Sequence, residues 1–228
     1  MISPEEQSHG IVTSNCREEY TVEKASTRLD EFMQELTRLK KEGNPEKVDA
    51  YITEFLKAME IERNQCSICG PGSGWFDPAL MITALNESAT YYREAGIYDK
   101  AVLLYERMML EIKWTGRDES PDGVSARINL AAAQTEKGER EAAAENLNEA
   151  RKILEKCTDA DQQVILALVQ NLASIYAMQG ALAFQQKYAE AADGFAGAAD
   201  VLKQYTGESR EYMICKENEK KAQAQITA

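Results

Sequence analysis

Two cysteines at zinc-ligand spacing are the most conspicuous chemical feature of the sequence. Cys66 and Cys69 are separated by two residues in the stretch QCSICGPGSGW. A structural zinc site needs four ligands, and Cys16 and His9 could supply the other two of a Cys₃His site. A redox pair needs the thiols at a helix N-terminus of a thioredoxin-like fold, whose strands the sequence lacks. Because a lone CxxC is a weak signal, we favour a loop with two thiols and keep zinc as the alternative.

The residue patterns of common enzymes are missing from the sequence. It contains one histidine and no GxSxG, P-loop or HExxH motif. The glycine-rich stretch 70–74 is not followed by the lysine and hydroxyl residue that a phosphate loop requires. Carboxylates are plentiful, but on the helix surfaces of an acidic protein they are more often solvated than catalytic. We therefore expect no enzymatic activity and no cofactor.

The composition predicts that these residues are carried by helices. A chain of 228 residues with 44 % hydrophobic residues can bury a core of its own. Alanine, glutamate, leucine and lysine dominate, there are five prolines, and runs of β-branched residues are scarce. This balance predicts an all-α fold. Five irregularly spaced cysteines in a chain of this length indicate mostly reduced thiols in a cytoplasmic protein.

The net charge restricts the classes of partner. The formal charge is −12, from 38 acidic and 26 basic side chains, so the average field repels phosphate backbones and anionic lipid surfaces. The first ten residues do not have the basic and apolar regions of a signal peptide. No apolar stretch approaches the roughly 18 residues that span a bilayer. We expect neither a nucleic-acid partner nor a membrane anchor.

A repeat with a period of 42 residues runs through the middle of the chain. Segments 85–108 and 127–150 align with small residues at matching places: Ala89 with Ala131, Gly96 with Gly138, and Ala101 with Ala143. Small residues let two helix backbones approach closely, and a glycine permits the turn between them. Each copy is therefore predicted to be an antiparallel helix pair. Such pairs stack into a solenoid, because one pair cannot bury its own apolar face.

A third copy begins at 169–180, where Ala173 and Gly180 keep the step of 42 residues and Gly180 takes the place of the turn glycine. Its second half comes late, because Ala191 follows Ala143 by 48 residues. Six extra residues therefore separate the two halves of this copy. We expect a lengthened helix or a wider turn there.

The rest of the chain is predicted to complete one continuous solenoid domain. Gly43 is placed for a turn, and Asn44 and Pro45 are placed to start the next helix. Similar helix starts are expected at Asp77–Pro78 and Ser120–Pro121. The predicted order is an irregular segment over 1–18, a degenerate helix pair over 19–62, an inserted Cys/Gly loop over 63–77, three helix pairs over 78–205 and a capping helix over 206–228.

These repeats resemble the tetratricopeptide repeat (TPR). The signature of that family occurs in the first clear copy as Ala89, Tyr92, Gly96, Tyr98, Ala101 and Tyr105. The longer period, with INLA at 128–131, QNLA at 170–173 and MLEI at 109–112, is similar to the repeats of kinesin light chains and their bacterial relatives. The resemblance covers 79–215 well and 20–62 weakly. The chain departs from the pattern at Gln134 and Arg140, which replace tyrosines of the first copy, and at the six-residue insertion.

The resemblance implies a right-handed superhelical solenoid of antiparallel helix pairs, whose first helices line a concave, peptide-binding groove. Equivalent groove positions form three columns: Gln34, Glu87, Asn129 and Asn171; then Thr37, Thr90, Ala132 and Ser174; then Lys40, Arg93, Thr135 and Ala177. In related proteins, asparagines of the first column hold the main chain of an extended peptide. A carboxamide offers a donor and an acceptor side by side, which matches any peptide group.

We therefore expect a protein or peptide ligand to be bound chiefly by Asn129 and Asn171. The flanking contacts would come from Asn86, Glu87, Thr90, Arg93, Gln170 and Ser174. The alternative for the asparagines is contact with water or a neighbouring helix only. The mixed charges of the groove favour neutral or basic ligand segments.

The expected function is that of a scaffold or adaptor for protein interactions. Two other functions stay open. One is a structural or assembly subunit that joins a complex, or a homo-oligomer, through its convex face or repeat ends. The other is a peptide-sensing regulator that acts through protein contacts.

Overall fold

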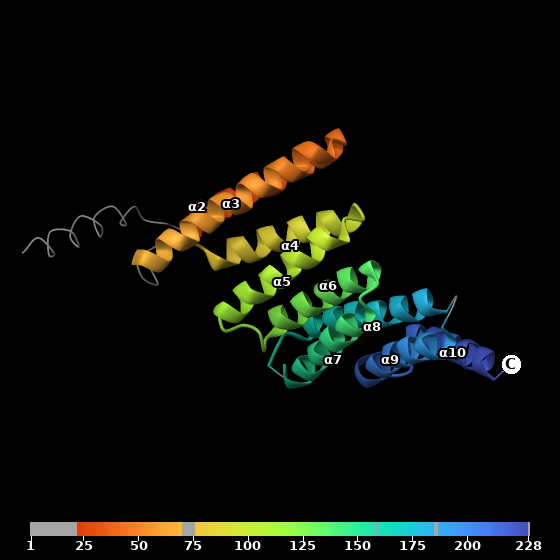
Figure 1. Ribbon diagram of the computed structural model, residues 1–228. Coiled ribbons are helices and arrows are strands. Elements are labelled where there is room, and N and C mark those ends of the chain that lie inside the picture. The colour runs from red at the N-terminus through yellow and green to blue at the C-terminus, as the bar shows by residue number, and fades with distance from the viewer. Residues whose placement is uncertain (1–21, 70–75, 158, 185–186, 228) are drawn as a thin grey trace, which may run out of the picture. The chain divides into compact units, whose positions relative to one another are not determined.

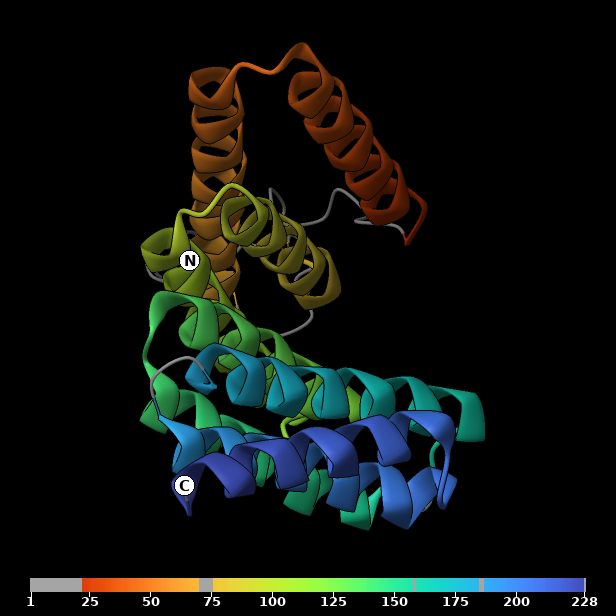
Figure 2. The ribbon, with the colours of Figure 1, turned by 90° about the vertical axis from the view of Figure 1, so that its right-hand side faces the viewer.

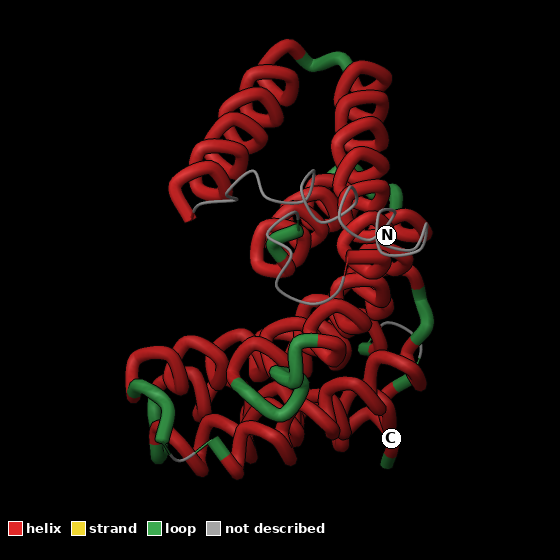
Figure 3. Tube along the Cα trace, turned by 90° about the vertical axis from the view of Figure 1, so that its left-hand side faces the viewer, coloured by secondary structure: helices red, strands yellow, loops and turns green. Residues whose placement is uncertain are grey.

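The computed structural model describes residues 22–69, 76–157, 159–184 and 187–227 of the chain, and every regular element among them is an α-helix (Figures 1 and 3). This agrees with the all-α prediction. The helices are α2 (Val22–Glu42), α3 (Pro45–Cys69), α4 (Pro78–Glu94), α5 (Tyr98–Trp114), α6 (Pro121–Lys137), α7 (Arg140–Lys156), α8 (Gln162–Ala183), α9 (Tyr188–Thr206) and α10 (Arg210–Ile226).

The chain divides into two compact units, Met1–Ser88 and Ala89–Ala228, rather than the one continuous domain that the sequence predicted. In the first unit, α2 and α3 form the helix pair expected over 19–62. Gly43 has a φ of +67°, and the Asn44 side chain accepts a hydrogen bond from the Lys47 N–H at 3.1 Å. The turn and the helix start therefore form as predicted.

The helix α3 continues to Cys69, so residues 63–69 of the Cys/Gly loop predicted over 63–77 are helical. Cys66 and Cys69 thus lie in the last turn of a helix, and residues 70–75 lie outside the described residues. The predicted zinc ligands Cys16 and His9 lie in the segment 1–21, which the structure does not describe, as do the side chains of Cys66 and Cys69. The zinc hypothesis therefore stays a prediction.

In the second unit, the turns of the first two clear copies form as the glycines predicted. Gly96 and Gly138 have φ values of +73° and +94°, a conformation that costs residues with a Cβ atom about 1–2 kcal/mol. α6 starts at Pro121, where the Ser120 side chain accepts a hydrogen bond from the Asp122 N–H at 3.2 Å. The helices α6 and α7 therefore follow each other through a glycine turn, in the order of helix, turn and helix.

Gly180 is not the turn glycine of the third copy. It lies inside α8, which runs for 22 residues where α6 runs for 17. A methyl group added at Gly194 of α9 would come within 2.5 Å of the Gly180 backbone nitrogen. The two glycines thus mark a close crossing of α8 and α9. The six-residue insertion is accommodated largely by a lengthened helix, which was one of the two expectations.

The core of the second unit is built between these helix pairs and closed by α10. One buried cluster takes Ala131 from α6, Leu147 from α7, Leu172 from α8 and Leu202 from α9. Cys215 of α10 belongs to the same cluster, and α10 lies along α9 (Figure 2). The predicted capping segment 206–228 therefore contains one helix that covers the last pair.

The helix α8 is more apolar than the sequence analysis allowed. Its segment Gln162–Ala181 has a mean hydropathy of 1.4 and is long enough to cross a membrane, although only by length and composition. The expectation that no stretch approaches this length was therefore wrong. In the fold α8 packs against α6, α7 and α9, but only 33 % of the segment is buried.

Candidate functional site

The two asparagines singled out from the sequence lie on neighbouring helices. Asn129 belongs to α6 and Asn171 to α8, and these two helices pack against each other. Asn129 is half-buried, whereas Asn171 is exposed. Both stand at the same position of their repeat, and the binding of a ligand by the two carboxamides stays a prediction.

Two predicted flanking residues already have partners within the second unit. The Thr90 hydroxyl shares a hydrogen bond with the Tyr105 hydroxyl at 2.9 Å. Arg93 Nη1 lies 3.6 Å from Glu136 Oε1, so its positive charge is largely compensated. Burial raises the pKa of Glu136, and the attraction of Arg93 opposes this shift. The Thr90 hydroxyl is thus engaged within the fold, and Arg93 has a carboxylate beside it.

Two column positions on α6 are wrong as groove positions. Ala132 and Thr135 are only 3 % and 2 % exposed. Thr135 Oγ1 accepts a hydrogen bond from Gln179 Nε2 of α8 at 3.2 Å. The physical reason is that α8 packs on this part of α6, so the second and third columns are covered here.

Asn86 and Glu87 belong to the first compact unit. Both are half-buried, and Asn86 Nδ2 donates a hydrogen bond to Glu87 Oε1 at 3.1 Å. The column positions of α2 in that unit, Gln34, Thr37 and Lys40, are exposed. Asn129 and Asn171 belong to the second unit, and the predicted site that joins them with these residues stays a prediction.

The exposed side of α8 is uncharged along its whole length. The helix contains no Asp, Glu, Lys or Arg. Its exposed polar side chains include Gln170 and Ser174, and the Ser174 hydroxyl donates to the Gln170 carbonyl at 2.8 Å. The residues of this surface, which we call the α8 strip, are Gln163, Val164, Leu166, Ala167, Gln170, Asn171 and Ser174.

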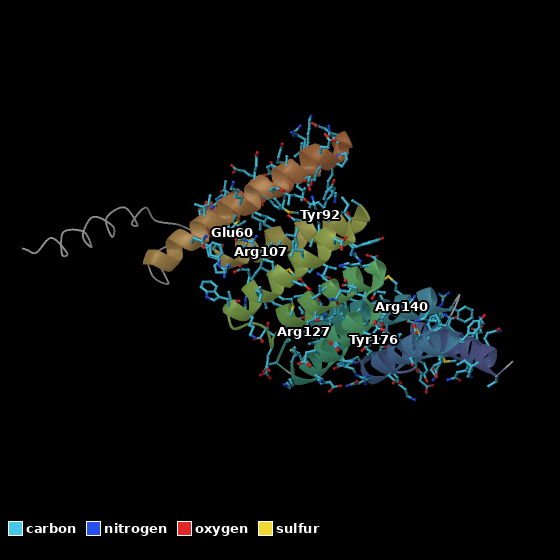
Figure 4. The ribbon with its side chains drawn as sticks, viewed as in Figure 1. Glu60, Tyr92, Arg107, Arg127, Arg140 and Tyr176 are labelled. Carbon is cyan, nitrogen blue, oxygen red and sulfur yellow. The ribbon has the colours of Figure 1, made fainter. Side chains whose placement is uncertain are left out.

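A cavity of about 300 Å³ lies between α7, α8 and α9, and sequence reasoning did not find it. Arg140 and Tyr176, which line it, are labelled in Figure 4. Arg140 Nη1 lies 2.8 Å from Glu190 Oε2, and hydrogen bonds from Lys187 and Arg140 lower the pKa of Glu190. The only sequence signal was the insertion before α9. The cavity contains no residue of the α8 strip.

Metal binding has no support in the parts of the chain that the structure describes. Within them, no group of three or more His, Cys, Asp or Glu side chains is placed to hold a metal ion. Of the two cysteine side chains that the structure describes, Cys157 and Cys215, the more deeply buried is Cys215, whose thiol has a pKa raised by burial. A thiol with a raised pKa is less reactive, because the thiolate is the nucleophile and the metal ligand.

Comparison with known proteins identifies the fold. No profile of a known protein family matches the chain, and no curated protein matches it. Among solved structures, BtubC (BKLC) from P. vanneervenii is 18 % identical and has a TM-score of 0.53, over 97 % of this chain and 91 % of that one.

Another similar structure, from Podosopora anserina, is described as that of a kinesin light chain with nearly identical TPR-like repeats. It is 17 % identical with a TM-score of 0.38, over 87 % of this chain and 96 % of that one. The likeness to the P. vanneervenii structure, at this low identity, shows a TPR-like helical-repeat fold.

Proposed function

We propose that this TPR-like repeat protein binds an uncharged, extended segment of a partner protein along the α8 strip. The observation that carries the proposal is that α8 has no charged residue, in a chain in which 28 % of residues are charged. A solvated helix face normally carries charges. An exposed surface that mixes apolar and neutral polar side chains is typical of a binding site.

The chemistry of the strip suits a peptide main chain. Gln170 and Asn171 each offer a carboxamide, which can donate to a carbonyl and accept from an N–H of the same ligand. Asn129 would add a third carboxamide from the neighbouring helix α6. Val164 and Leu166, which are 44 % and 42 % exposed, would contact apolar side chains of the segment. Because Arg93 is compensated by Glu136, an acidic ligand gains little here.

The test uses the full chain and a peptide library displayed on phage. Enriched peptides are synthesised, and their Kd is measured by fluorescence anisotropy with the wild type and with Asn129→Ala/Asn171→Ala. We expect enriched peptides of low net charge and a Kd raised at least tenfold in the double variant. Tenfold corresponds to about 1.4 kcal/mol, the size of one or two net hydrogen bonds.

Gln225→Ala is the matched control, because Gln225 is an exposed carboxamide on α10, outside the strip. It should leave the Kd unchanged, and circular dichroism should show the same helix content in all three proteins. Equal affinity of the wild type and the double variant would overturn the asparagine contacts. Enrichment of highly charged peptides would overturn the choice of an uncharged ligand.

A further inference from the structure

The outer face of α5 carries a stripe of exposed apolar side chains. Leu103, Leu110 and Trp114 are 63 %, 65 % and 57 % exposed. Their spacings of seven and four residues place them within about 40° of one another around a helix of 3.6 residues per turn. At about 1.5 Å per residue the stripe is roughly 16 Å long. We call these three residues the α5 stripe.

The repeat itself does not require this stripe. In α7, 42 residues later, the equivalent positions are Glu145, Lys152 and Lys156, and in α9, after 48 more, they are Asp193, Asp200 and Gln204. All six of these residues are exposed. The same outward positions are thus charged or polar in the sister helices and apolar only in α5. Apolar residues that the fold does not need at the surface mark an interaction site.

The charges beside the stripe indicate what covers it. Glu106 and Lys113 are both exposed and lie seven residues apart, on the same edge of the stripe. In an antiparallel pair of identical helices, the same edge of each helix lies on the same side of the interface, and the two edges run in opposite directions. A two-fold axis midway between these positions therefore sets Glu106 of one chain level with Lys113 of the other, and the reverse. A parallel arrangement would instead place this edge of one helix on the opposite side of the interface from the same edge of the other, so Glu106 and Lys113 would not meet.

We propose that the α5 stripe is a dimer interface, in which a second copy of this chain packs its α5 antiparallel about that axis. Leu110 then lies close to its own counterpart at the centre, and Trp114 lies near Leu103 of the other copy. The interface is isologous, as in most two-fold dimers. A contact by one helix buries less than the roughly 800 Å² per partner of a standard interface, so the dimer is expected in the micromolar range. The inference goes beyond the proposed peptide binding, because the stripe shares no residue with the α8 strip.

The test measures the oligomeric state of the full chain by sedimentation equilibrium from about 1 to 200 μM. The wild type should dimerise, and Leu110→Lys should raise the dimer Kd at least tenfold. Lysine is chosen because Lys152 occupies the equivalent place in α7, so this position of a repeat helix accommodates a lysine side chain. Glu145→Lys on α7 is the matched control, and it should leave the dimer unchanged.

Charge exchange tests the antiparallel arrangement separately. Glu106→Lys and Lys113→Glu should each raise the dimer Kd severalfold, because each places like charges opposite each other. The double exchange Glu106→Lys/Lys113→Glu should restore the wild-type Kd to within about twofold. A wild type that stays monomeric at every concentration would overturn the proposal. So would a dimer that is insensitive to Leu110→Lys, or charge exchange without rescue.

Discussion

At the scale of single residues, two polar contacts of the second unit bear on its stability. Gln134, only 5 % exposed, accepts a hydrogen bond from Asn146 Nδ2 at 2.9 Å, at a position where the first copy has Tyr92. Arg93 and Glu136 form a looser pair at 3.6 Å, and Arg93 Nε and Glu136 Oε2 are buried without a hydrogen-bond partner. Buried polar atoms without partners lower stability.

The Glu136 carboxylate is therefore expected to lower the stability of the protein at neutral pH. Its pKa is raised by burial, more than the attraction of Arg93 lowers it. The folded state thus binds the proton more tightly than the unfolded chain does. The loss of stability is complete above the folded pKa and disappears as the pH falls below the unfolded value of about 4.5. Glu136→Gln should raise the free energy of unfolding at pH 7 by up to about 1 kcal/mol.

Urea unfolding of both proteins at pH 7 and pH 4 measures this difference, which should shrink at the lower pH. Glu139→Gln is the control, because Glu139 lies 2.7 Å from Lys137 and raises the pKa of that lysine by a hydrogen bond. Its removal should not stabilise the protein. A less stable Glu136→Gln variant at pH 7 would show that the ion pair with Arg93 outweighs the burial of the carboxylate.

At the scale of elements, the crossing of α8 and α9 depends on small residues. A Cβ at Gly194 would lie 2.5 Å from the Gly180 nitrogen, whereas one at Gly197 would meet the Tyr176 ring at 2.9 Å. Backbone cannot move aside as a side chain can. Gly194→Ala should therefore destabilise the protein by about 1–3 kcal/mol, as overpacking does. Gly197→Ala should have a smaller effect.

Thermal unfolding followed by circular dichroism measures both variants against the wild type. Equal losses of stability in the two variants would mean that α8 and α9 move apart at Gly194 as readily as the Tyr176 ring moves away from residue 197. A fully stable Gly194→Ala variant would show that α8 and α9 do not cross as closely as the glycines indicate.

The sequence predicted the helix pairs well because their signals are local. Gly43, Gly96 and Gly138 each follow a helix and precede another, and the structure gives all three a positive φ. Gly180 stands in the same register but lies inside a helix. The 42-residue spacing of the glycines could not reveal that Gly180 lies inside a helix, because the extra residues of this copy come after the glycine rather than before it.

The candidate site was harder to predict than the fold. Exposure of Asn171 follows from the helix periodicity, but burial of Ala132 and Thr135 depends on how closely α8 lies on α6. That contact involves residues about 40 positions apart, such as Thr135 and Gln179. The α5 stripe, by contrast, could have been found from the sequence, by comparing the outward positions of the three repeats.

At the scale of the whole molecule, the helix α10 packs along α9 in the second unit. One face of α10 is buried, where Cys215 is 8 % and Ala222 is 0 % exposed. Ala222 packs in a second small cluster with Ala191 and Phe195 of α9. α10 thus covers apolar surface that α9 would otherwise expose to water, as terminal repeats of solenoids do.

A chain that stops after Gly207 should therefore lose stability and tend to aggregate. We expect its Tm to fall by several degrees, since about 1 kcal/mol shifts the Tm of a domain of this size by roughly 2–4 °C. Scanning calorimetry with light scattering measures both effects. A chain that stops after Gln223 is the control, because side chains 224–227 are exposed. An unchanged Tm without α10 would show that the repeats are equally stable when the apolar surface of α9 is left uncovered.

The absence of charge on α8 also determines what its surface can sense. The titratable side chain of α8 is that of Tyr176. It is buried, and burial raises its pKa above the ordinary value for tyrosine, which already lies above the physiological range. A change of acidity within the physiological range therefore alters no protonation state on this helix, and added salt has no charge on it to screen. The rest of this acidic protein responds to both conditions. The α8 surface therefore keeps the same protonation state and the same lack of charge, while the charges on the rest of the protein respond to pH and salt.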